Sequence, residues 1–423
     1  MVTRLSKNLY NASLYGVRQH FFATETYKNY YVQKPEFVEQ KNPDFKALPA
    51  KVAGEVMLQA HRGYTSFFAL LKKKRAGEYD KPVNIPGYLP KDGKNVVYYP
   101  KDALSKKVKK LENGLFLHHA CINSKQFRLQ VTSRFEKLDM IRIVPRNGYF
   151  IIECVYEAVE DSKLKDNGRY ASIDLGVNNF VTLVSNVMEP IIFGGLLKSI
   201  NQYYNKRRAE LQSQLPKYVY WSKQLEGLTN KRNFKIKHEM HVIAKQIVNH
   251  LVSNNINTLV VGYNKGWKQD INLGKRNNQN FVFLPHSKFV EILRYLCELH
   301  GIIFKVTEES YTSQTSFLDN ERPIEKFGNE ARKEAGKKPA VRRVQRGVFK
   351  ADSGQVINAD VNSGFQIMKK VVPKRKLCFP YGIDAVAIRP RRVRQQSRCA
   401  STVKRDETRV GEKSGSGIII NEN

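Results

Sequence analysis

The chain has 423 residues, of which 41% are hydrophobic, and a formal net charge of +33 from 72 Lys plus Arg against 39 Asp plus Glu. This length predicts two or three domains with their own cores, and the hydrophobic content excludes a wholly disordered chain. So large a positive excess would repel itself in a compact fold. It indicates a polyanionic partner, whose binding releases counterions, and nucleic acid is favoured over a merely solvated basic surface.

The cysteines and the apolar segments exclude further classes of protein. The number of cysteines is odd, no two have C-x-x-C spacing, and they are spread over Cys121, Cys154, Cys297, Cys378 and Cys399. We therefore expect a reducing, cytoplasmic compartment and no zinc site. The longest apolar runs have the length of strands, and the first residues do not resemble a signal peptide, so we expect no membrane association.

The first 165 residues are expected to form helices followed by short strands. Leu48–Arg75 has helical periodicity and ends on the basic run Lys72, Lys73, Lys74 and Arg75, which suits the negative pole of the helix dipole and could bind phosphate. Pro82, Pro86 and Pro90 break the chain after it. Aromatic side chains before Tyr31 are equally consistent with a core and with stacking on unpaired bases.

Alternating β and α patterns follow from about residue 168. In chain order we expect strands at Tyr170–Leu175, Asn179–Val184 and Pro190–Phe193, followed by basic helices within Lys198–Lys237 that are broken near Pro216. A helix at His238–Val252, a strand at Thr258–Gly262, a helix from Pro285 to Gly301 and a buried strand at Ile302–Val306 come next. Residues 319–352 are expected to be charged and irregular, and a last helix is expected at Ala359–Val371. The first three strands suit an antiparallel meander. The polar chain after Pro373 is expected to be largely disordered.

Acidic residues stand at the ends of these predicted elements. Asp174 ends an apolar strand, Glu308 and Glu309 follow another, and Asp360 opens the last helix. Each acid taken singly could instead cap a turn or helix, or pair with a lysine. Their order along the alternating pattern favours a shared site in which carboxylates hold two divalent cations for phosphodiester hydrolysis. Side chains alternate along a strand, so only one of Glu308 and Glu309 can point into it.

Several segments resemble the TnpB family, transposon-encoded RNA-guided DNA nucleases related to type V CRISPR effectors. Ala171–Val177 (ASIDLGV) resembles the first RuvC-like motif and Ile357–Asn362 (INADVN) the third. Thr258–Ser316 resembles one branch of the family, through VVGYNKGWKQ at Val260–Gln269 and EESYTS at Glu308–Ser313. The resemblance is specific over Tyr170–Val371 and faint over the first 165 residues.

Two departures from the usual pattern of the family bear on the site. Gly262 stands where most members have the middle catalytic glutamate, and in this branch the glutamate is moved to the next strand, which points to Glu308 or Glu309, with Glu309 preferred. The two C-x-x-C pairs that usually precede the third motif are replaced by basic residues. The resemblance thus implies catalytic and metal-binding roles for Asp174, Glu309 or Glu308, and Asp360, with Mg²⁺ or alternatively Mn²⁺ as cofactor and no zinc.

The resemblance also implies an architecture. We expect an α/β RNase H-like (RuvC-like) nuclease core over residues 166–372, with a basic helical insert at 198–237 and a degenerate target-nucleic-acid-binding insert at 314–352. Residues 1–15 and 82–165 would form a β-barrel-like wedge domain, and residues 16–81 a helical recognition lobe inserted into it. Residues 373–423 would be a basic, disordered tail.

The function implied by the resemblance is guided DNA cleavage in the prokaryotic cytoplasm, on nucleoid DNA. One protein would bind one transposon-derived guide RNA, read a short adjacent motif and cut the complementary double-stranded DNA. Two alternatives are a nuclease-inactive guided DNA-binding regulator and an unguided RNase H-like nuclease or transposition accessory protein. The residues expected to contact nucleic acid are Lys72, Lys73, Lys74, Arg75, Lys206, Arg207, Arg208, Lys231, Arg232, Lys265, Trp267, Lys268, Lys275, Arg276, Arg342, Arg343 and Arg346.

Overall fold

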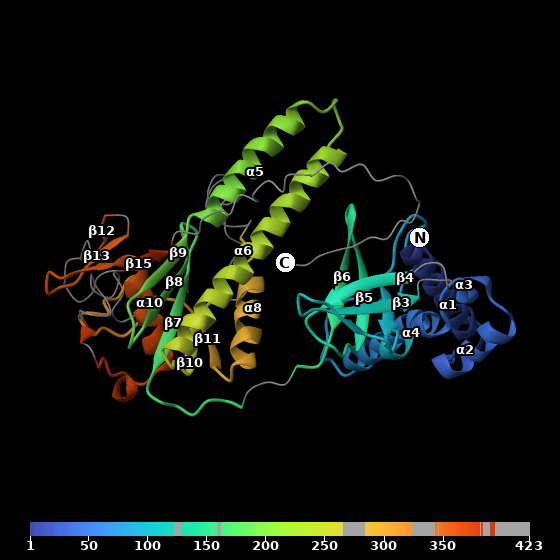
Figure 1. Cartoon of the computed structure of the whole chain (residues 1–423), viewed down its shortest axis with the longest axis horizontal. Helices are drawn as coiled ribbons and strands as arrows, with labels where there is room; N and C mark the ends of the chain where they lie inside the picture. The colour runs from blue at the N-terminus through green and yellow to red at the C-terminus, as the bar shows by residue number, and fades with distance from the viewer. Residues whose placement is uncertain are drawn as a thin grey trace. The chain divides into compact units, whose positions relative to one another are not determined.

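The computed structural model describes residues 1–121, 128–158, 162–264, 284–323, 343–345, 347–380, 382–383 and 390–393. It divides into two compact units, Met1–Glu157 and Ala158–Arg405 (Figure 1). Among the described residues, no helix combines the length and the apolar character needed to cross a bilayer.

Unit 1 begins with a group of helices. They are α1 (Val2–Thr24), α2 (Tyr30–Glu39), α3 (Pro43–Lys46) and α4 (Ala50–Arg75). The sequence predicted α4 to within two residues, but the periodicity of α1 was missed. Buried Leu9 on α1 packs with Val56 and Met57 on α4. Because α1 continues through Gly16, the boundary expected there between a wedge segment and a helical lobe falls inside a single helix.

A buried polar network ties three of these helices together. The Tyr27 hydroxyl donates to His61 Nδ1 at 2.8 Å, and His61 Nε2 lies 2.9 Å from Gln33 Oε1. Gln33 in turn accepts from the Ser13 hydroxyl at 2.7 Å. Burial lowers the pKa of His61 to about 4, so the imidazole is neutral and serves the packing of the helices.

The strands of unit 1 form two three-stranded antiparallel sheets, ordered β1-β5-β6 and β2-β3-β4. Their bounds are β1 (Val97–Pro100), β2 (Lys109–Lys110), β3 (Phe116–Cys121), β4 (Arg128–Ser133), β5 (Met140–Arg146) and β6 (Tyr149–Val155), with a 3₁₀ turn at Lys101–Ala103. These strands confirm the expectation that short strands follow the helices in this part of the chain. Val97, Tyr99 and Ile141 form the core beneath them with Val52 of α4.

Unit 2 is built on a six-stranded mixed sheet ordered β11-β10-β7-β8-β9-β15. Its strands are β7 (Tyr170–Leu175), β8 (Asn179–Ser185), β9 (Ile191–Gly194), β10 (Thr258–Gly262), β11 (Ile303–Thr307) and β15 (Arg391–Val393). The antiparallel meander β7-β8-β9 confirms the prediction. β10 then lies parallel to β7 on one side and to β11 on the other, so the carboxyl ends of these three strands meet at one edge.

Helices cover both faces of this sheet (Figure 1). On one face α6 (Lys223–Ser253) and α8 (His286–Leu299) pack against Ala171, Ile173 and Leu175. On the other lies α10 (Ala359–Val371), close enough for the Ser172 hydroxyl to donate to the Gly364 carbonyl at 2.6 Å. A Cβ at Gly364 would come within 3.0 Å of Val184, so this close approach depends on the missing side chain.

Four expectations about unit 2 need correction. The helix expected at His238–Val252 is the second half of one 31-residue helix, α6. β11 is an edge strand whose side chains are exposed or half-buried, so it is not the buried strand predicted. The segment expected to be irregular contains β12 (Arg343–Gln345) and β13 (Val348–Lys350), and β13 lies between β12 and β14 (Val356–Asn358) in a small antiparallel sheet.

The fourth correction concerns the chain after Pro373. A 3₁₀ turn at Lys374–Lys376 is followed by Phe379, which packs against the core around Phe317 and Phe365. Further on, β15 pairs in parallel with β9 at the edge of the main sheet. Within 373–393, the described residues are therefore part of the fold. Residues 394–423 of the expected tail lie outside the described residues.

Candidate active site

Three of the predicted acids, Asp174, Glu308 and Glu309, lie at the carboxyl edge of the parallel strands. Ile173 pairs with Val261, so Asp174 and Gly262 are the next residues on adjacent strands, which places them roughly 5 Å apart. Gly262 pairs in turn with Thr307, and Glu308 and Glu309 follow directly. The fold thus brings the acid of β7 and the pair after β11 to the two sides of Gly262.

Glu309 occupies the space that a side chain at Gly262 would take. A Cβ built on Gly262 would lie 2.9 Å from both Cγ and Oε1 of Glu309, and 2.5 Å from Cδ1 of Ile367 on α10. No side chain fits there without displacing one of them. The half-buried carboxylate of Glu309 therefore stands over β10, beside the strand that carries Asp174.

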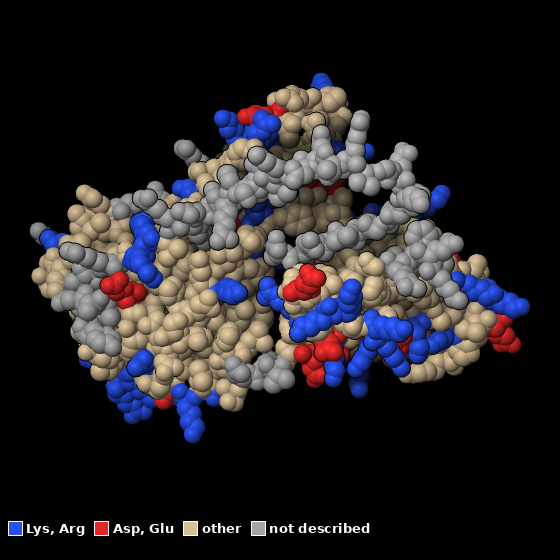
Figure 2. Space-filling view, in the orientation of Figure 1, with Lys and Arg blue, Asp and Glu red and all other residues tan. Residues whose placement is uncertain are grey.

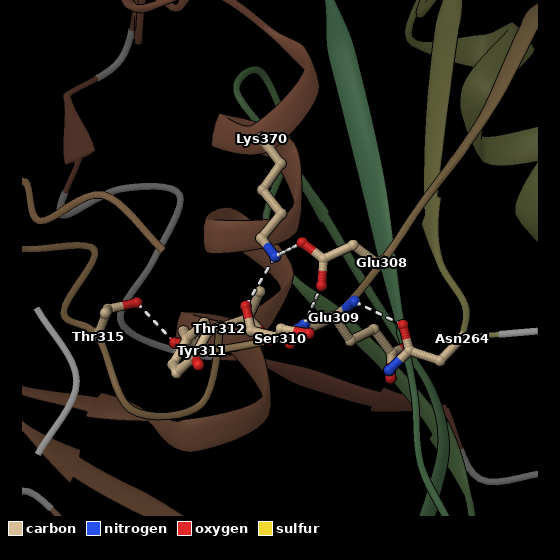
Figure 3. Close-up of polar contacts among 8 residues, drawn as sticks. All are labelled: Asn264, Glu308, Glu309, Ser310, Tyr311, Thr312, Thr315 and Lys370. Atoms are coloured by element: carbon tan, nitrogen blue, oxygen red, sulfur yellow. Dashed lines mark hydrogen bonds and ion pairs between the residues drawn. The ribbon is translucent and has the colours of Figure 1, made fainter. Parts of the chain in front are cut away.

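Glu308 points elsewhere. Its carboxylate forms an ion pair with Lys370 of α10 and accepts the Ser310 N–H at 2.6 Å. Figure 3 shows its side chain directed to Lys370, while the Glu309 side chain leaves the chain on the other side. Lys370 also donates to the Ser310 carbonyl at 2.7 Å, and Asn264 accepts the Glu309 N–H at 2.9 Å. These bonds fix the backbone of the loop on both sides of Glu309.

The two neighbouring carboxyls differ in acidity. Burial raises the pKa of Glu309 to about 7, although the charge of Lys370 acts in the opposite direction. For Glu308 the burial effect also acts upward, but hydrogen bonds from Lys370 and Ser310 outweigh it and lower the pKa. No hydrogen bond to the Glu309 carboxylate is present among the described residues. A half-buried carboxylate in this condition is suited to a cation.

Asp360 lies in the first turn of α10. Asn358 is the N-cap, and its Oδ1 accepts the N–H groups of Asp360 and Val361. The alternative that Asp360 itself caps the helix is therefore wrong. Its carboxylate instead accepts a hydrogen bond from Asn179 Nδ2 at 2.6 Å. Asn179 is the first residue of β8, which pairs with β7, the strand that carries Asp174. The bond therefore links the start of α10 to the sheet close to Asp174.

The carboxylates share this region but do not form one cluster. Among the described residues, no three His, Cys, Asp or Glu side chains are close enough to hold a metal ion together. Ile367, which flanks the Glu309 carboxylate, is about 10 Å along α10 from Asp360 by the helical rise. Glu309 thus lies on the β10 side of Asp174 and Asp360 on the β8 side. All three supply the oxygen donors that Mg²⁺ prefers, but in this arrangement they are not gathered as one set of ligands.

Sequence reasoning did not identify the polar residues that hold these acids. Asn179, Asn264 and Lys370 orient Asp360 and the Glu309 backbone. The available signal was weak: Asn179 and Asn264 lie at the start and just past the end of predicted strands, where polar residues are common. Lys370 could be linked to Glu308 only once the fold was known.

The predicted nucleic-acid contacts are distributed over both units. Lys72, Lys73, Lys74 and Arg75 are exposed at the end of α4. Exposed Lys206, Arg207 and Arg208 lie on α5 (Leu196–Ser213), and exposed Lys231 and half-buried Arg232 on α6. Figure 2 shows Lys and Arg side chains over both units with acids among them. Arg343 is in β12; Lys265, Trp267, Lys268, Lys275, Arg276, Arg342 and Arg346 lie outside the described residues.

Comparison with known proteins gives consistent matches. The family model OrfB_IS605, described as a probable transposase, matches residues 153–268, and the Cas12f1-like TNB domain model matches residues 286–367. A TnpB-like protein, ORF457 of Acidianus two-tailed virus, is 23% identical over 413 residues, covering 87% of this chain and 82% of the viral protein. The cryo-EM structure of a Cas12f1–sgRNA–target DNA complex is similar in fold, with a TM-score of 0.56 at 13% identity, covering 88% of this chain and 82% of that one.

Proposed function

This chain belongs to the TnpB family, and on that premise we propose that it is an RNA-guided endodeoxyribonuclease. It would bind a transposon-derived guide RNA and cut complementary double-stranded DNA beside a short adjacent motif, with sequence specificity supplied by base pairing. The net charge of +33 supports a large polyanionic partner. We place one protein on each guide RNA, in the prokaryotic cytoplasm and on nucleoid DNA.

The observation that carries the nuclease assignment is the position of Glu309 over Gly262, beside the strand that ends in Asp174. The usual middle acid of the family is missing at Gly262, and a carboxylate from the next strand fills the same space. We propose that Asp174 and Glu309 at the strand edge act together with Asp360 at the start of α10.

We assign metal binding to Asp174, Glu309 and Asp360, with Mg²⁺ preferred and Mn²⁺ as the alternative. When bound, such ions supply an activated water and stabilise the leaving oxygen of the phosphodiester. The chain positions its own ligands for this role. Asn179 orients Asp360, while Asn264 and Lys370 fix the backbone around Glu309. Glu308, held by Lys370, faces away from the site and has no place in the chemistry.

The two units would have different roles in guided cleavage. We propose that unit 2 is the RuvC-like nuclease core and that unit 1 combines the wedge domain with a helical recognition lobe formed by α1 to α4. In the segment 314–352, basic residues would replace the absent cysteine pairs in holding the phosphates of the target. The exposed basic end of α4 offers a phosphate contact in unit 1.

The test is guided cleavage by the purified complex. The protein is expressed with its native flanking DNA, the RNA that co-purifies is sequenced, and duplexes matching its guide segment with randomised flanks are incubated in Mg²⁺. We expect cutting of matched duplexes with one flank, abolished by chelation and by Asp174→Ala, while the variant still binds RNA and target. Matched binding without cutting by the wild type would identify a regulator, and cutting without RNA an unguided nuclease.

A further inference from the structure

A groove of about 700 Å³ runs between α5 and α6, the two helices that project from the sheet as a hairpin (Figure 1). Its volume is that of a ligand-sized cleft. Apolar residues form part of its lining and cationic side chains flank it. The lining residues used below are Ser199, Tyr203, Leu211, Gly227, Lys231 and Lys235.

The groove is held open by bonds between the helices. The Tyr204 hydroxyl lies 3.1 Å from Thr229 Oγ1, and Arg232 Nε donates to Asn201 Oδ1 at 2.8 Å. The Arg232 guanidinium also lies over the Tyr204 ring, 5.6 Å from its centroid. Because these contacts set the spacing of α5 and α6, a ligand would find the groove already formed and would lose little free energy in ordering it.

The surface of the groove combines the two features that bind a single nucleic-acid strand. Lys231 and Lys235 are exposed, one helical turn or about 6 Å apart on the same face, and neither forms an ion pair among the described residues. The Tyr203 side chain is 63% exposed. Cations that follow a backbone beside an aromatic ring that stacks on a base are the usual means of holding unpaired strands.

Two further observations extend this surface. Gly227 leaves space above α6, since a Cβ there would meet nothing within 4 Å. The outer end of the hairpin carries Tyr218, Tyr220 and Trp221, which are 77%, 80% and 60% exposed. Lys217 lies over the Tyr218 ring at 5.3 Å. Aromatic rings stack on any base, so this end can accept a strand of any sequence.

The inner end of the groove lies next to the candidate active site. Lys198, one residue before Ser199 of the groove, donates to Asn178 Oδ1 at 2.6 Å. The neighbouring residue, Asn179, holds the Asp360 carboxylate. From Ser199 to Leu211 the groove extends roughly 18 Å along α5, by the helical rise. A nucleic-acid strand lying in the groove would therefore reach the region of the Asp360 carboxylate at its inner end.

We propose that this groove binds the unpaired DNA strand that is to be cut and leads it to the carboxylates, with its phosphates on Lys231 and Lys235 and a base on Tyr203. This rests on the proposed function, because it takes the substrate to be DNA opened by the guide. The groove selects for a single strand rather than a sequence, since its contacts are to phosphates and to the face of a base.

Photo-crosslinking tests the proposal directly. Uncut complexes of the Asp174→Ala protein are assembled with 5-iododeoxyuridine in the displaced DNA strand or with 4-thiouridine in the guide RNA, and crosslinked peptides are mapped. We expect DNA crosslinks at Tyr203, reduced at least fivefold in Lys231→Glu/Lys235→Glu. Crosslinks to the guide RNA alone at this position would overturn the proposal and make the groove an RNA site.

Kinetics supply the second arm. In Lys231→Glu/Lys235→Glu and in Tyr203→Ala we expect cleavage to slow at least tenfold while RNA retention and guide–target pairing stay unchanged. Lys245→Glu, at an exposed position elsewhere on α6, is the matched control and should cut normally. Cleavage at the wild-type rate in both groove variants contradicts the proposal. If the wild type cuts no DNA, the proposed nuclease function is wrong. Crosslinking of a free iodinated oligodeoxynucleotide to the groove then still tests whether the groove binds single-stranded DNA.

Discussion

The Glu309 carboxylate lies where the side chain of residue 262 would be: a Cβ on Gly262 would approach Glu309 Oε1 to 2.9 Å. Two positions from different strands therefore compete for one space at the strand edge. The space can hold the side chain of an acid at position 262 of β10 or the side chain of Glu309, which follows β11, but it cannot hold both. This exclusion makes Gly262 a requirement of the site and leads to the predictions below.

Glu309→Gln should abolish cleavage, and Glu308→Gln should not. Loss of a metal ligand removes several kcal/mol of transition-state stabilisation, so we expect at least a 100-fold slower rate for Glu309→Gln. Glu308 is engaged with Lys370 on the other side of the loop, and its substitution should cost less than about tenfold. Single-turnover rates on a matched duplex in Mg²⁺ distinguish the two. Equal rates for both variants would remove Glu309 from the site.

Gly262→Ala should impair cleavage through a single added methyl group. The new Cβ would overlap Glu309 and Ile367, and overpacking of this kind costs about 1–3 kcal/mol. We expect a lower melting temperature and a cleavage rate at least tenfold lower, with RNA and target binding retained. Gly364→Ala, which crowds Val184 on the same face of the sheet, controls for destabilisation alone. Should both variants lose activity in proportion to stability, the specific role of Gly262 would be refuted.

The stability of the metal-free protein should decline between about pH 4.5 and 7 because of Glu309. Its folded-state pKa is raised to about 7, so the folded state keeps a proton that the unfolded state has already lost. The resulting loss in the free energy of unfolding is complete above pH 7 and amounts to at most about 3 kcal/mol. Mg²⁺ should reverse it by binding the ionised carboxylate. Thermal unfolding of Glu309→Gln should show neither the decline nor the gain from Mg²⁺, and persistence of both in this variant would contradict the assignment.

Truncation after Pro380 should destabilise unit 2. The deletion removes β15, whose pairing with β9 extends the main sheet, and leaves the β9 edge uncovered. We expect a melting temperature several degrees lower, from the loss of about 1–3 kcal/mol. A truncation after residue 393 keeps β15 and serves as the control. If the shorter chain unfolds at the same temperature as this control, β15 contributes nothing to stability.

Most elements of unit 2 could be predicted because they are strongly patterned. The strand at Tyr170–Leu175 and the helix at Ala359–Val371 were predicted at their observed bounds, because apolar residues mark both clearly; the N-cap Asn358 was not recognised from the sequence. α1 was missed because its inward face carries Ser6 and Ser13 among the apolar residues, which weakens the period. β15 has almost no hydrophobic signal, because an edge strand of three residues is held by backbone pairing.

The site could be predicted only in part from the sequence. The acids were proposed from their positions at the ends of clear elements, but the choice between Glu308 and Glu309 depends on the direction in which each side chain leaves the backbone. That direction is set by Lys370, about 60 residues away on α10, and by Asn264, which follows the end of β10. No local pattern contains it.

The pairing of β15 with β9 joins residues about 200 positions apart, Arg391 with Ile191. During synthesis β9 emerges about 200 residues before its outer partner, so the nascent sheet exposes an open edge until β15 has left the ribosome. Such edges invite pairing with other chains. β15, the last strand among the described residues, thus covers an edge that is open during translation, and slow elongation just before residue 391 should increase aggregation more than slow elongation in the region before β9.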